Sequence, residues 1–186
     1  DELGARPHYD VRVRILVTGG VRSGKSRHAE ELLSGAAVVT YVAPGRPADG
    51  TDPDWDVRVA RHRADRPAQW TTLETTDVAG AVARADGAVL VDCLGTWLVG
   101  LMDGGQLWDA PTDEAHDAMA AQIGPLCDAL AATPEAVVVT NEVGLGVVPA
   151  HRSGVVFRDL LGILNQRVAA VCDEVHLVIA GRVLKI

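Results

Sequence analysis

A glycine-rich segment near the start of the chain constrains the fold more than any other feature. Residues 19–26 read GGVRSGKS and satisfy the pattern G-x-x-x-x-G-K-[ST]. The preceding VRILVT is typical of a buried strand, and the following SRHAEELL is typical of an amphipathic helix. Because backbone N–H groups and a helix N-terminus surround phosphate oxygens in this context, the segment predicts a phosphate-binding loop. A plain glycine-rich turn before a helix is the alternative interpretation.

Every residue of this segment has an expected role in binding a nucleotide. Lys25 is expected to bridge the terminal phosphates as a catalytic cation, and the Ser26 hydroxyl is expected to bind Mg²⁺. Lysine is rare in the chain, because Lys25 and Lys185 are the only lysines among 17 lysine and arginine residues. The predicted nucleotide contacts of the loop are Gly19, Gly20, Val21, Arg22, Ser23, Gly24, Lys25 and Ser26.

A second nucleotide-binding signal follows a later apolar run. The segment AVLVDCLGTW places Asp92 at the end of a predicted strand, where nucleotide-dependent enzymes keep an acidic partner for the metal ion. Asp92 is therefore the predicted Mg²⁺ ligand that acts beside Ser26. Capping of the helix that follows is an alternative role for the same carboxylate.

The apolar pattern along the chain predicts an α/β fold. Short β-branched runs alternate with segments of helical periodicity, as in a mostly parallel sheet with helices on both faces. With the glycine-rich segment, this order predicts a single P-loop NTPase-type domain over residues 13–186, preceded by a tail or expression remnant at residues 1–12. Strands are predicted at 13–18, 37–43, 88–92, 136–140, 174–180 and 183–186. Helices are predicted at 25–33, 54–65, 77–84, 94–101, 113–131 and 152–172, with exposed loops at 44–53 and 103–112.

Composition argues against several other classes of protein. The 186 residues carry a net charge of −8, which repels a phosphate backbone, so no nucleic-acid partner is expected. No apolar run approaches the roughly 20 residues of a membrane span, and residues 1–10 lack the order of a secretory signal. The 3 cysteines lie far apart and form neither a metal nor a disulfide pattern, so we expect a cytoplasmic location.

Two other kinds of nucleotide-binding protein share parts of this pattern. Residues 92–95 read DCLG and fit the DxxG motif of switch GTPases, which also read guanine with an N/T-K-x-D motif. Neither lysine stands in such a context, and residues 140–144 of the late loop read TNEVG, so a switch GTPase is not expected. A small-molecule kinase that uses the phosphate loop without nucleotidyl transfer remains an alternative.

A basic segment in this acidic chain is the main candidate for covalent chemistry. Arg58, Arg61, His62, Arg63 and Arg66 fall within nine positions, and residues 58, 62 and 66 have the spacing of one helix face. The arginines favour a neutral, nucleophilic imidazole at His62 and neutralise phosphate charge. Attack of this imidazole on phosphorus would form a phosphoramidate. A solvated charged face is the alternative, and the other five of the 6 histidines are expected to be structural.

Five segments, taken in order, carry a resemblance to a known enzyme family. They are GGVRSGKSRHAE, HRADRPAQWTTLE, VLVDCLGTWL, VVVTNEVGLGVVP and FRDLLGILNQRVAA. From about Arg14 to the C-terminus, the chain resembles the bifunctional adenosylcobinamide kinase / adenosylcobinamide-phosphate guanylyltransferase of cobalamin synthesis. The resemblance implies phosphorylation of adenosylcobinamide by ATP or GTP. It also implies transfer of GMP from GTP to the resulting phosphate through a GMP-histidine intermediate.

The same resemblance implies residues for the site. His62 matches the histidine that carries GMP, although some members have a histidine pair where this chain has Arg61-His62. Residues 141–149 would shape the corrinoid side, with Glu142 as a candidate base, and the protein would be a homotrimer with active sites between subunits. The further nucleotide contacts implied are Ala43, Pro44, Gly45, Arg63, Ala64, Asp65, Arg66, Glu74 and Asp92. The alternative interpretation of Glu74 is a surface residue of a short edge strand.

Overall fold

The computed structural model of the protein describes residues 13–186 except 47, 49 and 65, and at 58, 62 and 64 it describes the backbone alone. The expected tail at residues 1–12 lies outside the described residues. The strands are β1 (Arg14–Gly19), β2 (Val39–Ala43), β3 (Thr71–Glu74), β4 (Ala88–Asp92), β5 (Ala136–Val139), β6 (Glu174–Ile179) and β7 (Arg182–Lys185). The helices are α1 (Lys25–Leu32), α2 (Pro53–Ala64), α3 (Val78–Ala83), α4 (Leu94–Gly104), α5 (Thr112–Ala132) and α6 (Arg152–Ala169).

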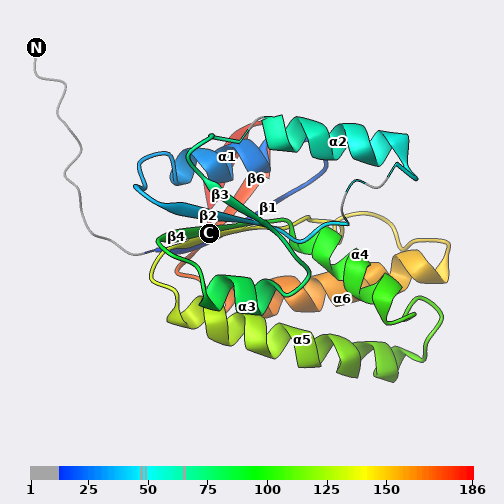
Figure 1. Ribbon diagram of the computed structural model, residues 1–186. Coiled ribbons are helices and arrows are strands. Elements are labelled where there is room, and N and C mark those ends of the chain that lie inside the picture. The colour runs from blue at the N-terminus through cyan, green and yellow to red at the C-terminus, as the bar shows by residue number, and fades with distance from the viewer. Residues whose placement is uncertain (1–12, 47, 49, 65) are drawn as a thin grey trace, which may run out of the picture.

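The strands form one mostly parallel sheet, as the sequence predicts. Their order is β3-β2-β4-β5-β1-β6-β7, and only the β6–β7 pair is antiparallel among the described strands. Helices α1 and α2 lie on one face of the sheet, and α3, α4, α5 and α6 lie on the other (Figure 1). Because the carboxyl ends of parallel strands share one edge, the ends of β1, β2, β3 and β4 open toward the same side, where ligands bind in folds of this type.

Successive side chains of β1 point to opposite faces of the sheet, and both faces are covered, which explains why the strand is a continuous apolar run in the sequence. Ile15 and Val17 pack into the core beneath α1, whereas Leu16 packs into the larger core on the opposite face. All three are less than one-tenth exposed. Both faces of the central strands are therefore buried, as expected for a parallel sheet covered by helices on both sides.

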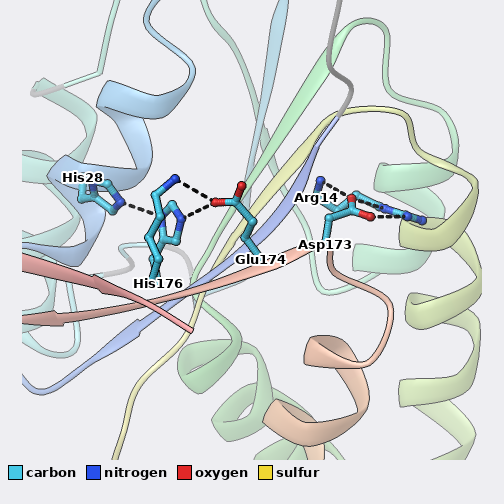
Figure 2. Close-up of polar contacts among 6 residues, drawn as sticks. Arg14, His28, Asp173, Glu174 and His176 are labelled. Atoms are coloured by element: carbon cyan, nitrogen blue, oxygen red, sulfur yellow. Dashed lines mark hydrogen bonds and ion pairs between the residues drawn. The ribbon is translucent and has the colours of Figure 1, made fainter.

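An ion pair joins the start of β1 to the segment that precedes β6. The Arg14 guanidinium donates to both carboxylate oxygens of Asp173, which precedes β6, at 3.0 Å each (Figure 2). The Arg14 side chain and backbone N–H lower the pKa of the Asp173 carboxyl to about 2. This pair fixes the start of β1 against β6, the neighbouring strand that comes last in the parallel sheet.

The structure departs from the predicted elements at a few places. Strand β3 confirms the short edge strand expected at Glu74, but its bounds were not predicted, because TTLE has a single apolar residue and all four residues are exposed at the edge of the sheet. Helix α4 continues to Gly104 and so takes in the start of the predicted loop at 103–112. Helix α6 ends at Ala169, before the predicted end at Cys172. None of the helices in the described part of the chain is both long and apolar enough to cross a membrane.

Candidate active site

The glycine-rich segment connects β1 directly to α1, as predicted. A Cβ at Gly19 would lie 2.4 Å from the carbonyl oxygen of Val178, so only glycine fits between these strands. Gly24 precedes α1 with a φ of 97°, and no described side chain caps the helix there. The first N–H groups of α1 are thus available to an anion at the helix N-terminus.

The loop itself is tightly held. Lys25 is 9% exposed, and its Nζ donates to the carbonyl oxygen of Gly20 at 3.1 Å. The Ser23 carbonyl accepts from the N–H of Gly181, in the turn between β6 and β7, at 2.8 Å. The Ser23 hydroxyl is buried and has no hydrogen-bond partner among the described residues. Such an orphaned buried hydroxyl inside a phosphate-binding loop is an observation that favours a bound ligand.

Asp92 lies at the carboxyl end of β4, but the structure contradicts its alternative role as a helix cap. The N-cap of α4 is Cys93, and the Asp92 carboxylate instead accepts from the Tyr41 hydroxyl through Oδ2 at 3.0 Å. Burial raises the pKa of the Cys93 thiol, Asp92 acts in the same direction, and the charge of Lys25 opposes it. Cys93 also packs in the core beneath α1, the helix that begins at Lys25.

A pocket opens beside these groups at the carboxyl ends of β2, β3 and β4. Helix α2 covers it with Trp55 and Val59. The ring of Trp55 comes so close to Gly45 that a Cβ there would lie 3.1 Å from it. The pocket is lined by Tyr41, Ala43, Gly45, Arg46, Trp55, Val59, Arg66, Glu74, Asp92, Cys93 and Thr96. It brings together five predicted nucleotide contacts, namely Ala43, Gly45, Arg66, Glu74 and Asp92, whereas Pro44 is buried and is not among its lining residues.

Two predicted arginines occupy different positions around this pocket. Arg63 forms a bidentate ion pair with Glu74, with Nε to Oε1 at 2.8 Å and Nη2 to Oε2 at 2.7 Å. The guanidinium of Arg66 lies over the ring of Tyr41, with Cζ 3.9 Å from the ring centroid. The Nε and Nη1 atoms of Arg66 are buried without a hydrogen-bond partner among the described residues. Arg66 is therefore the pocket cation that most clearly needs an anion.

The predicted nucleophile is carried by the helix over the pocket. His62 falls on α2, and positions 55, 59 and 62 are spaced i, i+4 and i+7, which places them on one helix face. Trp55 and Val59 of the same helix line the pocket. The side chains of His62 and Ala64 and the whole of Asp65 lie outside the described residues, so their roles stay predictions. Helix α2 ends before Arg66, so the predicted stripe of residues 58, 62 and 66 does not lie on one continuous helix.

The segment 141–149 follows β5 next to the phosphate loop. The N–H of Glu142 donates to the carbonyl oxygen of Gly19 at 3.1 Å, and the Glu142 carboxylate accepts from the N–H of Gly144 at 2.6 Å. Arg158 of α6 donates to the carbonyls of Gly144 and Gly146. The side chains of Val143, Leu145, Val147 and Val148 are exposed by 38%, 85%, 94% and 67%. The fold thus holds an apolar, solvent-facing loop beside the phosphate loop.

Two of the histidines expected to be structural lie together on the other side of β1. His28 of α1 and His176 of β6 share a hydrogen bond of 2.9 Å, and His176 is bonded to Glu174 at 2.8 Å (Figure 2). His176 is fully buried, and Glu174 also accepts from Lys185 at 3.0 Å. Burial lowers the pKa of His28, and the neighbouring His176 adds to that shift. This chain of contacts joins α1 to the sheet.

Sequence reasoning missed several pocket residues, of which Tyr41 and Trp55 are the most informative. Tyr41 is the third residue of β2, and in the sequence it resembles any aromatic residue of a strand. Trp55 resembles any residue in the first turn of a helix. The available signal was positional, because both residues flank the loop after β2 that was already predicted to lie near the phosphates. Their contacts with Asp92 and Gly45 depend on the tertiary structure and have no local signature.

The fold and this site define a class: a P-loop enzyme that binds a nucleoside triphosphate at the carboxyl edge of a mostly parallel sheet. The loop, its uncapped helix, Lys25 and the carboxylate after β4 are the parts that this class requires. The chain belongs to the cobinamide kinase / cobinamide phosphate guanyltransferase family, whose model matches residues 15–186. Membership confirms the prediction of a bifunctional kinase and guanylyltransferase of cobalamin biosynthesis.

Curated relatives are similar over nearly their whole length. The chain is 41% identical over 183 residues to the bifunctional adenosylcobalamin biosynthesis protein CobU of Salmonella typhimurium, covering 92% of this chain and 98% of that protein. The CobU of Escherichia coli K12 is 40% identical with the same coverage. The bifunctional protein CobP of Pseudomonas aeruginosa is 37% identical, covering 91% of this chain and 94% of that protein.

A more distant structure shows the fold alone. A prototypical ATPase from a bacterial type III secretion system superposes with a TM-score of 0.55 at 11% sequence identity. The match covers 90% of this chain and 51% of that one. It supports the P-loop type of sheet predicted from the sequence.

Proposed function

We propose that this protein uses ATP or GTP with Mg²⁺ to phosphorylate the aminopropanol hydroxyl of adenosylcobinamide. We further propose that it transfers GMP from GTP to the resulting phosphate through a covalent intermediate on His62. The observation that carries the proposal is the juxtaposition at one sheet edge of the phosphate loop and a pocket. That pocket contains Arg66, two of whose guanidinium nitrogens are buried without a hydrogen-bond partner among the described residues, and it is covered by the helix bearing His62.

The donor set beside the phosphate loop fits Mg²⁺. Ser26 and Asp92 offer a hydroxyl and a carboxylate, both half-buried, and among the described residues only Oδ2 of Asp92 is engaged in a hydrogen bond. Mg²⁺ in nucleotide sites takes one or two protein oxygens and completes its shell with phosphates and water. When bound, the ion would neutralise phosphate charge. Lys25 and the first N–H groups of α1 would orient the phosphates from the other side.

The guanylyl transfer would proceed in two displacements on the α-phosphorus. A nitrogen of His62 forms a bond to the α-phosphorus of GTP while the bond to the bridging oxygen breaks and pyrophosphate leaves. A phosphate oxygen of adenosylcobinamide phosphate then attacks the same phosphorus, the phosphorus–nitrogen bond breaks and the imidazole is released. Arg66 would hold phosphate oxygens during both displacements, because two of its buried nitrogens need an acceptor.

We assign the corrinoid side to residues 141–149. The exposed apolar side chains of this loop offer a contact surface for the apolar parts of the corrinoid ring, and the hydrogen bond from the N–H of Glu142 to Gly19 keeps the loop beside the phosphate loop. Glu142 is the proposed base for the attacking hydroxyl. We also propose the homotrimer, with active sites between subunits, and a cytoplasmic location.

The decisive experiment uses GTP labelled at the α-phosphate without a corrinoid acceptor. We expect covalent protein label that is acid-labile and base-stable, as a phosphoramidate requires, and that is lost in His62→Ala. The matched control is His116→Ala, because His116 lies on α5 on the opposite face of the sheet. Label that persists in His62→Ala would assign the nucleophile to another residue. Absence of label in the wild-type protein would favour the alternative, a small-molecule kinase without nucleotidyl transfer.

A further inference from the structure

We infer that Tyr41 is a positioning residue for the nucleotide: its hydroxyl orients Asp92 and its ring supports Arg66. This inference rests on the proposed nucleotide site and assigns a role to a residue that has none in the reaction described above. Tyr41 itself would touch neither substrate nor metal. It acts through the two charged groups attached to it.

The position of Tyr41 is fixed by the sheet. It lies in β2 between β3 and β4, with Thr72 and Leu90 as its register partners. The side chain is 1% exposed and packs in the core beneath α1, with the ring of Trp70 at a centroid distance of 6.4 Å. A side chain held on all sides by a packed core keeps one rotamer, and so it keeps its polar end in one place.

The hydroxyl of Tyr41 points to the predicted metal ligand. It donates to Oδ2 of Asp92 at 3.0 Å, the one hydrogen bond of that carboxylate among the described residues. A hydrogen bond to a charged acceptor restricts the rotation of the carboxylate more than a neutral bond does. Oδ1 is thereby left in a defined direction for a cation.

The ring of Tyr41 contacts a group of the opposite charge, the guanidinium of Arg66. The Cζ of Arg66 lies 3.9 Å from the ring centroid, in cation–π range, although Arg66 lies beyond the end of α2. Two nitrogens of this guanidinium are buried without a hydrogen-bond partner among the described residues, and burial of a charged donor without an acceptor is costly. The ring therefore holds the Arg66 guanidinium in place, and a phosphate group would supply the hydrogen-bond acceptors that these two nitrogens lack.

One rigid side chain thus sets the spacing between an acidic group for the metal and a basic group for phosphate. A magnesium–nucleotide complex presents both partners at a fixed separation, because the ion is bound to the phosphates themselves. Tyr41 would match that separation before the nucleotide arrives, which reduces the cost of ordering the two side chains on binding.

The two contacts can be removed separately. Tyr41→Phe removes the hydroxyl and keeps the ring, so it should affect Asp92 alone, whereas Tyr41→Leu removes both contacts. Calorimetry with a GTP analogue that has a methylene between the α- and β-phosphorus, with and without Mg²⁺, measures binding without turnover. We expect the metal-free Kd of Tyr41→Phe to equal that of the wild type. We expect the increase in affinity produced by Mg²⁺ to be about tenfold smaller in Tyr41→Phe than in the wild type. We expect Tyr41→Leu also to weaken metal-free binding about fivefold.

Two controls separate positioning from a general loss of stability. Val42→Ala weakens the same strand at a fully buried residue that faces the opposite core, and it should leave the Mg²⁺ dependence unchanged. In an Asp92→Asn background, Tyr41→Phe should change the Mg²⁺ dependence little further, because the charged metal ligand that Tyr41 orients has already been removed. A Tyr41→Phe protein with the Mg²⁺ dependence of the wild type overturns the inference while leaving the nucleotide site intact. Failure of the wild-type protein to bind the analogue overturns both the inference and the proposed function.

Discussion

At the scale of single residues, the phosphate loop depends on the chemistry of two side chains. We expect Lys25→Ala and Ser26→Ala each to lower triphosphate-dependent phosphorylation by about a hundredfold or more, because they remove the bridging cation and a metal ligand. The matched control is Lys185→Ala, since Lys185 is exposed and pairs with Glu174 outside the pocket. Steady-state rates together with thermal unfolding of each variant provide the measurement. Near-normal turnover of both loop variants would contradict the assignment of this loop.

Asp92 permits a more selective test at the same scale. We expect Asp92→Asn to raise the Mg²⁺ concentration needed for half-maximal activity more than it weakens metal-free nucleotide binding, because the amide can still accept from Tyr41 but carries no charge. Titration of Mg²⁺ and of nucleotide in parallel measures the two effects. An unchanged Mg²⁺ requirement would remove Asp92 from the metal site.

The exposed apolar residues after β5 provide a third test. We expect the double substitution Leu145→Ser and Val147→Ser to weaken binding of adenosylcobinamide about tenfold and to leave nucleotide binding unchanged, because apolar contact with the corrinoid is lost. Val38→Ser is the control, since Val38 is 52% exposed and precedes β2 at the far edge of the sheet. Equal corrinoid affinity of the double variant and the control would place the corrinoid elsewhere.

At the scale of elements, the histidine contacts between α1 and β6 predict a pH dependence of stability. His28 has a pKa below its ordinary value of 6.5 in the folded protein, chiefly because of burial. The unfolded chain therefore binds more protons just below pH 6.5, so the stability from neutral His28 is present above that pH and is lost as the pH falls through the folded pKa. We expect the melting temperature to fall between pH 7 and pH 5, and to fall less in His28→Gln.

Elements with a local signature were predicted from the sequence, and those without one were not. The strand, loop and helix over residues 14–32 follow from contiguous residues, so their positions were predicted closely. Strand β3 exists because its backbone pairs with β2, and TTLE has little apolar content to reveal it. The contact of Asp92 with Tyr41 likewise depends on β2 and β4 lying side by side. The contact of Arg66 with Tyr41 depends on the path of the chain between α2 and β3.

At the scale of the whole molecule, nucleotide binding should stabilise the fold. GTP at a hundred times its Kd should raise the unfolding free energy by about 2.7 kcal/mol. ATP should compete for the loop, because residues 140–144 read TNEVG and no N/T-K-x-D motif is present in the sequence. Thermal shift measurements with each triphosphate test this expectation. A melting temperature that does not change with GTP would favour the alternative, a small-molecule kinase without nucleotidyl transfer.

Assembly can be measured independently. We expect light scattering to give about three times the chain mass of 19.6 kDa. A variant pair can test whether sites are shared: mixtures of inactive Lys25→Ala and inactive His62→Ala proteins should regain guanylyl transfer if the two residues of one site come from different subunits. A monomeric mass at micromolar concentration would contradict the trimer.

The contact between the phosphate loop and the turn after β6 has a consequence for the order of synthesis. Gly19 packs against the carbonyl of Val178, and the carbonyl of Ser23 accepts from Gly181, so the loop is completed by residues far along the chain. During translation the loop leaves the ribosome long before these partners exist. A nascent chain that ends before β6 therefore lacks the support that shapes its phosphate cradle, and nucleotide can assist folding only once β6 has joined β1.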